Sequence, residues 1–152
     1  MEINRYDGPR DHLAALFAEA DDSEQEIASY MHLGEVFVAR EQEKILGHVQ
    51  VVQSGEAGVF EIKSLAVEEG RRSLGIGRAL VRAAVAHCRS GGGHTVHVAT
   101  AAASIGALQF YQRQGFRIRR VIRDFYVASR GYRPLVLNGI PLLDEVILDI
   151  EL

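Results

Sequence analysis

Apolar positions change their spacing several times along this chain, and each change predicts the start or end of a helix or strand. Leu13, Leu16 and Phe17 recur at helical spacing, and Ser23 precedes a second helical stretch that it can cap. Alternating or continuous apolar runs follow, separated by charged or glycine-containing turns. The first half of the chain therefore predicts two short helices and three antiparallel strands, over residues 11–20, 23–30, 36–39, 45–52 and 59–67.

The second half of the chain predicts a helix shortly after the third strand. Leu80, Ala84 and Cys88 lie on one face of this helix, which ends at a run of three glycines. The next strand is expected to run parallel to the third strand, because a strand–helix–strand crossover returns the chain in the same direction. The remaining predictions are a strand at 95–100, a helix at 104–114, a strand at 116–122, a hairpin turn at 138–139 and a last strand at 146–150. These elements predict an α/β (α+β) domain that spans residues 1–152.

A basic loop with two glycines joins the third strand to this helix. From Arg71 to Arg78 it reads RRSLGIGR. The first N–H groups of a helix lack acceptors within the helix, and the helix dipole is positive there, so this position favours an anion. Gly75 and Gly77 leave the backbone open to a phosphate, and the arginines can add charge-assisted hydrogen bonds. The loop therefore predicts a phosphate-binding site.

Two common phosphate loops do not match these residues. A P-loop requires GxxxxGK followed by serine or threonine, and a dinucleotide fingerprint requires a third glycine where this chain has Leu80. The pattern from Arg72 to Gly77 is instead RxxGxG. On these six residues alone, the alternative to a phosphate-binding loop is an ordinary helix start, where the glycines only relax the backbone.

A second motif begins at Ser104 and reads SIGALQFYQRQGF. Its Ala107, Phe110 and Tyr111 fall on one face of a helix. Together the two motifs resemble those of the GCN5-related N-acetyltransferase (GNAT) superfamily, RxxGxG followed by NxxAxxFYxxxGF. The resemblance covers roughly residues 59–125. Ser104 stands where the family usually has asparagine, and a serine can still cap the helix and donate to a cofactor carbonyl.

The resemblance implies the GNAT fold, in which a mixed, mostly antiparallel sheet splays apart between two central parallel strands and is flanked by helices. In that fold the pantetheine arm of acetyl-CoA fills the gap like an added strand, here between residues 61–67 and 95–100. The implied co-substrate is acetyl-CoA, with no metal. The residues implied to bind it are Leu65, Ala66, Val67, Arg71, Arg72, Ser73, Leu74, Gly75, Ile76, Gly77, Arg78, Ser104, Ala107 and Phe110.

The resemblance also implies that a primary amine attacks the thioester directly, without a covalent enzyme intermediate. Tyr111 matches the family tyrosine that protonates the departing thiolate, and backbone N–H groups near Leu65 or Ala66 would stabilise the oxyanion. Glu61 lies in the run EIKSLAV, which fits the strand that carries the base glutamate in the histone-modifying branch. From the residues alone, Tyr111 also reads as a half-buried aromatic and Glu61 as a solvated or ion-paired surface residue.

Composition and charge exclude several other classes of protein. The net charge is −3 while the basic run is local, which favours a small anionic ligand over nucleic acid. The single cysteine, Cys88, lies on an apolar helical stripe, as expected for a buried inert thiol. His94 and His97 point to opposite faces of a strand, so no metal site is predicted. No signal peptide and no apolar run long enough for a bilayer is found, so we expect a cytoplasmic protein without a membrane partner.

The acceptor amine lies outside the two motifs. We expect a small molecule, because Asp21, Asp22, Glu24 and Glu26 fall where the family admits acceptors and favour a cation. From the residues alone, these four equally read as a solvated helix face. The alternatives are a protein or peptide N-acetyltransferase and a catalytically silent acyl-CoA-binding module. A homodimer through the last strands is a further hypothesis, because residues 146–150 would form an apolar edge.

Overall fold

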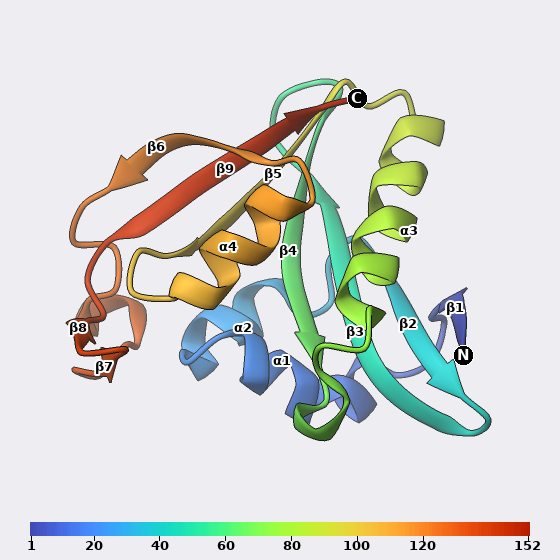
Figure 1. The fold of residues 1–152 in the computed structure, drawn as a ribbon, viewed down its shortest axis with the longest axis horizontal. Helices are drawn as coiled ribbons and strands as arrows, with labels where there is room; N and C mark the ends of the chain where they lie inside the picture. The colour runs from blue at the N-terminus through green and yellow to red at the C-terminus, as the bar shows by residue number, and fades with distance from the viewer.

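The computed structural model describes residues 1–152 and is built on a seven-stranded sheet in the order β1-β2-β3-β4-β5-β9-β6 (Figure 1). All neighbouring strands are antiparallel except β4 and β5, which are parallel. The strands are β1 (Glu2–Arg5), β2 (Glu35–Glu41), β3 (Lys44–Gln53), β4 (Val59–Val67), β5 (Thr95–Ala101), β6 (Arg117–Ile122) and β9 (Glu145–Glu151), with a separate hairpin of β7 (Val136–Leu137) and β8 (Ile140–Pro141). The predicted mixed, mostly antiparallel sheet is confirmed.

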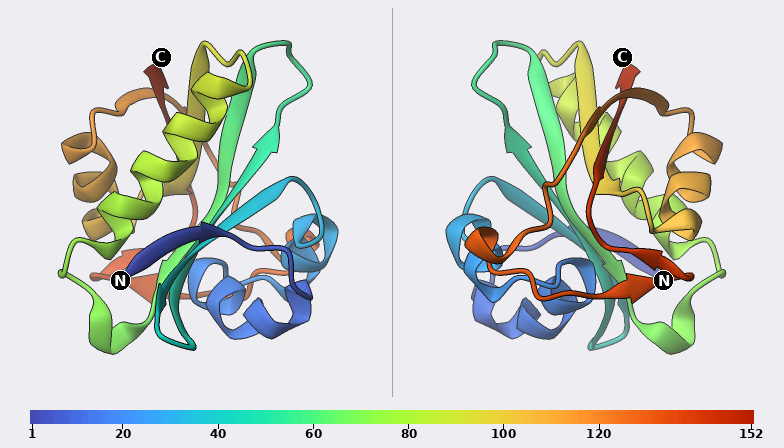
Figure 2. Two further views of the ribbon diagram at one scale, coloured as in Figure 1. Left: turned by 90° about the vertical axis from the view of Figure 1, so that its right-hand side faces the viewer. Right: turned by 90° about the vertical axis from the view of Figure 1, so that its left-hand side faces the viewer.

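Helices cover both faces of the sheet (Figure 2). On one face lie α3 (Ile76–Ser90) and α4 (Ile105–Arg113), and on the other lie α1 (Ala14–Ala20) and α2 (Glu24–Tyr30). Each face has its own core, centred on Leu80 and Leu148 under α3 and α4 and on Phe17 and Val36 under α1. Short 3₁₀ turns complete the chain at η1 (Arg10–Leu13), η2 (Glu69–Arg71) and η3 (Ala128–Arg130). The predicted helix 11–20 is thus split into a 3₁₀ turn and a short α-helix.

The two parallel strands separate along their length, as Figure 1 shows. Pairing of β4 with β5 runs from Val59 opposite Thr95 to Ile62 opposite Val98 and stops there. Beyond that point β4 remains paired with β3 alone, up to Val67 opposite Gly47. One side of the β4 backbone is therefore unpaired within the sheet over its last residues, which confirms the predicted splay.

A β-bulge in β4 lies at the start of this splay. The β3–β4 register shifts so that Gln50 faces Ser64 while Val51 faces Ile62, and Lys63 is left without a partner on β3. Ile62 and the half-buried Leu65, three residues apart, both pack in the core under α3 and α4. Strict alternation would put them on opposite faces, so the bulge is what turns Lys63 and Ser64 together toward the other face.

Two elements differ from the predictions. The chain contains an additional strand, β1, whose short polar sequence carries little alternation but pairs with β2. The expectation that Val146–Ile150 forms an open edge is wrong, because β9 lies between β5 and β6. The sheet edges are β1 and β6, so the argument for a dimer through an apolar last strand loses its basis. The predicted hairpin turn is confirmed, with positive φ at Asn138 and Gly139 as two-residue hairpin turns require.

Candidate functional site

The loop before α3 opens a cavity of about 560 Å³ on the α3–α4 face of the sheet. Gly75 is the N-cap of α3 and has φ +83°, a left-handed conformation that side chains rarely adopt. At Gly77 an added Cβ would lie 3.3 Å from the Phe110 ring, so the helix start and α4 approach closely. The cavity is lined by Glu19, Leu65, Ala66, Val67, Arg71, Arg72, Ser73, Gly75, Gly77, Arg78, Gly106, Gln109, Phe110, Arg113 and Gln114.

Four arginines make this cavity strongly positive, with Glu19 as its one acidic lining residue. Arg71 is 3.5 Å from Glu41 and Arg72 is 2.9 Å from Glu19, both at exposed positions where ion pairs are weak. Arg78 and Arg113 have no carboxylate oxygen within 4.0 Å. The residues present therefore fit a ligand with several negative charges at the start of α3.

The cavity continues onto the unpaired backbone of β4, because Leu65, Ala66 and Val67 line it. The carbonyl oxygen of Val67 accepts a hydrogen bond from Nε of Arg72 at 3.2 Å, so a side chain satisfies an acceptor that β5 leaves free. An extended chain of amides can make the same kind of bond by strand addition. The site thus offers a charged end for phosphates and a strand edge for an amide arm.

Most of the residues predicted to bind the cofactor come together in this cavity, and four do not. Leu74 is exposed in the loop, Ile76 is buried in the core, and Ala107 packs against that core. Ser104 is at the N-cap of α4, but its side chain makes no capping hydrogen bond and lines a different cavity. Sequence reasoning missed five lining residues, Glu19, Gly106, Gln109, Arg113 and Gln114.

A second cavity, of about 130 Å³, lies on the opposite face of the sheet between α2 and the segment that follows β6. Five carboxylates and one lysine are its charged lining residues, and four aromatic rings form much of its wall. The charged residues are Asp21, Asp22, Glu26, Glu61, Glu145 and Lys63, and the aromatic residues are Tyr30, Phe125, Tyr126 and Tyr132. Such a lining suits a small cation.

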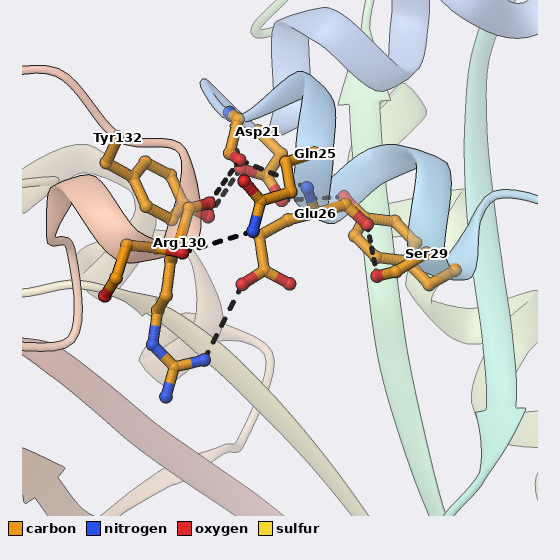
Figure 3. Close-up of polar contacts among 9 residues, drawn as sticks. Asp21, Gln25, Glu26, Ser29, Arg130 and Tyr132 are labelled. Carbon is orange, nitrogen blue, oxygen red and sulfur yellow. Dashed lines mark hydrogen bonds and ion pairs between the residues drawn. The ribbon is translucent and has the colours of Figure 1, made fainter.

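Asp21 holds the two sides of this acidic cavity together (Figure 3). Its carboxylate accepts hydrogen bonds from the hydroxyl groups of Tyr30 at 2.8 Å and Tyr132 at 2.7 Å, and from the backbone N–H of Ser23 at 3.1 Å. Burial raises the pKa of both tyrosines, and Asp21 raises it further. Because its acceptor capacity is largely used, Asp21 is a structural residue of the wall.

Further bonds fix α2 to η3 beside Asp21 (Figure 3). Ser23 accepts the N–H of Glu26 at 3.1 Å, which confirms it as the predicted cap, and donates to the Arg130 carbonyl at 2.6 Å. Gln25 donates to the Ser129 carbonyl at 3.2 Å, and the Arg130 guanidinium lies 3.6 Å from the Glu26 carboxylate. Glu26 is therefore already paired, which leaves the exposed Asp22 and the two sheet carboxylates, Glu61 and Glu145, without an ion pair in the protein.

Glu61 and Glu145 enter the acidic cavity from the sheet. Glu61 lies on β4 opposite His97 of β5, before the strands separate, and Glu145 is the first residue of β9, opposite Ala101. Glu145 is 7% exposed, has no cationic nitrogen within 4.0 Å and accepts no hydrogen bond from the protein. Burial raises the pKa of Glu145 to about 7. The charge of Lys63 lowers this pKa, but by less than burial raises it.

Tyr111 lies in neither cavity lining. Its ring is 7% exposed and packs edge-on against Phe110 and Phe116 in the core under α3 and α4. Its hydroxyl makes no hydrogen bond within the protein, and burial raises its pKa, so the phenol keeps its proton at neutral pH.

Other side chains that could act in catalysis or bind a metal have structural roles instead. His48 is fully buried, its Nε2 lies 2.8 Å from the Ser64 hydroxyl, and burial lowers its pKa to about 3. Cys88 is fully buried with a pKa raised to about 11 by burial, which confirms the predicted buried thiol. The structure contains no group of three or more His, Cys, Asp or Glu side chains arranged to hold a metal, and no helix in it is long and apolar enough to cross a membrane.

Comparisons with known proteins point to one family. A family model described as Acetyltransferase (GNAT) family matches residues 6–116. The uncharacterised N-acetyltransferase YvbK of Bacillus subtilis (strain 168) is 32% identical over 153 aligned residues, which cover 100% of this chain and 97% of that protein. An IAA acetyltransferase from Bacillus cereus ATCC 14579 is 30% identical, with a TM-score of 0.89 and 99% of both chains covered. A Bacillus subtilis acetyltransferase in complex with CoA is 28% identical, with a TM-score of 0.90 over 99% of this chain and 98% of that one.

Proposed function

The chain belongs to the GNAT family of acetyltransferases, and we propose that it transfers the acetyl group of acetyl-CoA to the primary amine of a small molecule. The observation that carries this proposal is the pair of cavities on opposite faces of the splayed strands. The positive cavity reaches Leu65 and Ala66 of β4, and the acidic cavity reaches Glu61 and Lys63 of the same strand. A donor and an acceptor bound in them would meet where β4 and β5 separate.

Acetyl-CoA would supply the thioester carbonyl, and Arg71, Arg72, Arg78 and the start of α3 would hold its phosphates. In the overall reaction a nitrogen–carbon bond forms and a carbon–sulfur bond breaks. Glu61 takes the proton that the acceptor ammonium loses, and the Tyr111 hydroxyl gives a proton to the departing sulfur. Backbone N–H groups near Leu65 stabilise the negative charge that develops on the carbonyl oxygen.

A small acceptor is favoured over a peptide by the size of the acidic cavity. At about 130 Å³ it is close to the roughly 150 Å³ that accommodates benzene in an engineered apolar cavity. Hydrogen bonds of Asp21 and Ser23 close its wall against η3 and Tyr132, where a peptide acceptor would need an open groove. A cytoplasmic location remains a prediction of the sequence.

Selective stabilisation by acetyl-CoA is the first expected result. At about a hundred times Kd, a ligand that binds only the folded state adds about 2.7 kcal/mol, or roughly 5–10 °C in Tm for a domain of this size. Differential scanning fluorimetry with acetyl-CoA, ATP and NADH measures it. A rise with acetyl-CoA alone supports the positive cavity as its site, and equal behaviour of the three ligands contradicts it.

A matched pair of glycine variants tests where that ligand binds. In Gly77→Val the added methyl groups enter the positive cavity beside Phe110, so the stabilisation by acetyl-CoA should be lost. Gly55→Val adds the same atoms at a position with open space around it and should retain the full shift. A thiol-release screen of pooled amines then separates an enzyme from a silent binding module, because only the enzyme releases CoA.

Glu61→Gln is expected to lower kcat by about ten- to a hundredfold at pH 7, because the neutral amide cannot accept the ammonium proton. The loss should shrink at high pH, where more of the amine is already neutral. The pH profile of kcat/KM measures this, with Glu43→Gln as the control, since Glu43 is exposed in the β2–β3 turn. An unchanged acidic limb in Glu61→Gln would remove Glu61 from the mechanism.

A further inference from the structure

One buried carboxylate of the acidic cavity lacks a partner in the protein. Glu145 is buried, yet it forms no ion pair and accepts no hydrogen bond, whereas Asp21 is bonded to two tyrosines and Glu26 to Arg130. Buried charges are normally paired, because removing a charge from water without compensation is costly. An unpaired buried carboxylate that faces a cavity points to a cationic ligand.

The groups around Glu145 do not supply that compensation. From β4 it faces Lys63 and Glu61, from η3 Arg130, and from β6 Arg120. The Lys63 ammonium lies 4.8 Å from the centre of the Tyr30 ring, and Arg130 is paired with Glu26 while it stacks at 4.1 Å over Phe125. Tyr126, whose pKa is raised by burial and by Glu145, completes the surroundings. Lys63 and Arg130 are thus engaged with aromatic rings or with another carboxylate, and Arg120 has no nitrogen within 4.0 Å of the Glu145 carboxylate.

We propose that the acceptor is a compact primary amine with a second positive charge, such as a short aliphatic diamine, and that Glu145 pairs with the ammonium group that does not react. This inference rests on the proposed function. It follows from the two unpaired sheet carboxylates, because Glu61 removes a proton from the reacting amine while the other nitrogen stays charged. The aromatic wall of Tyr30, Phe125, Tyr126 and Tyr132 suits the alkyl chain and both cationic ends.

The ionisation of Glu145 predicts how this binding depends on pH. A carboxylate with a pKa of about 7 is half protonated near neutrality, and only its ionised form pairs with an ammonium group. Affinity for a diamine should therefore rise between pH 6 and pH 8, and binding at pH 7 should release a proton from the protein. A neutral molecule of the same length should show neither effect.

Isothermal titration calorimetry with 1,4-diaminobutane, in buffers of different ionisation enthalpy, tests the proposal without any turnover. We expect binding to the wild type and to Glu43→Gln at pH 8, binding weaker by tenfold or more in Glu145→Gln, and none of 1-butanol. n-Butylamine should bind more weakly than the diamine, since it has one charge for two carboxylates. In kinetics, Glu145→Gln should raise KM for the diamine and change kcat little.

Three results would overturn the proposal: equal affinity of wild type and Glu145→Gln for the diamine, equal binding of 1-butanol, or no diamine binding to the wild type at any pH. Should Glu145→Gln fail to fold, the pH dependence and proton release of the wild type decide the matter. Failure of the proposed function is a separate result, because diamine binding without release of CoA contradicts acetyl transfer and leaves the cation site standing.

Discussion

Replacing Glu145 by glutamine should make the protein more stable at pH 8, by up to about 3 kcal/mol. The folded state holds the pKa of this carboxyl at about 7 through burial, against an ordinary value of 4.5. Ionising it above pH 7 therefore destabilises the folded state, by about 1.36 kcal/mol for each tenfold difference in proton affinity. Glutamine keeps the shape of the side chain and has no charge to desolvate.

The sign of this effect fixes its pH dependence. A raised pKa means that the folded protein binds more protons than the unfolded chain between about pH 4.5 and 7, so the wild type loses stability as the pH rises through that window. Urea unfolding should show an advantage of Glu145→Gln of about 3 kcal/mol at pH 8 and of about 1 kcal/mol or less at pH 5. Glu43→Gln should show no such trend, because residue 43 is exposed.

Two outcomes would count against this account. Equal stability of wild type and Glu145→Gln at pH 8 would mean that the ionised carboxylate is solvated or paired in the folded protein. A variant that is less stable at both pH values would mean that the carboxylate stabilises the fold. A wild type that 1,4-diaminobutane stabilises at pH 8, beside a variant that it does not, would link the stability cost to ligand binding.

The sequence predicted the elements that bind the cofactor because their signals are local. A basic glycine loop between a strand and a helix requires only neighbouring residues, and Val59–Val67 and the start of α3 fall where the pattern placed them. The splay of β4 and β5 followed from family resemblance. The bulge at Lys63 did not, because a register shift depends on β3, which lies earlier in the chain.

The acidic cavity was only partly predictable because its lining comes from distant segments. Asp21, Asp22 and Glu26 were expected near an acceptor and do line the cavity, whereas Glu24 does not. Glu145 begins a strand in which Val146 and Leu148 face the core, so alternation predicts a solvent-facing position. It is buried because the chain after β6 folds over this end of the sheet, a long-range contact with no local signal.

The tyrosines also show that local sequence does not predict long-range contacts. Tyr132 and Tyr30 meet at Asp21 although 102 positions separate them, and nothing in either sequence neighbourhood predicts the contact. Tyr111 was found by its motif, yet its role is not evident from its packing, since it is surrounded by Phe110 and Phe116. A motif can thus identify a residue whose chemistry its packed neighbours do not display.

Tyr111→Phe should lower kcat by about 10²–10⁴ and leave the stabilisation by acetyl-CoA within a degree or two of the wild type. A general acid contributes a factor of this size, and burial keeps the phenol protonated until the sulfur needs the proton. Because the hydroxyl makes no hydrogen bond within the protein, its removal should change the free energy of unfolding by less than about 0.5 kcal/mol. Loss of turnover would therefore not reflect loss of the fold.

Tyr6→Phe is the matched control for this experiment. Tyr6 is as buried as Tyr111, at 6% exposed, but it lies in the core under α1 and donates its hydroxyl to the Pro9 carbonyl at 2.7 Å. Its loss should reduce stability by about 1 kcal/mol and leave kcat unchanged, the reverse of the Tyr111 result. Measured by thiol release at saturating amine, equal kcat for wild type and Tyr111→Phe would show that the thiolate leaves without this acid. Protonation would then fall to solvent, and Tyr111 would be a residue of the core.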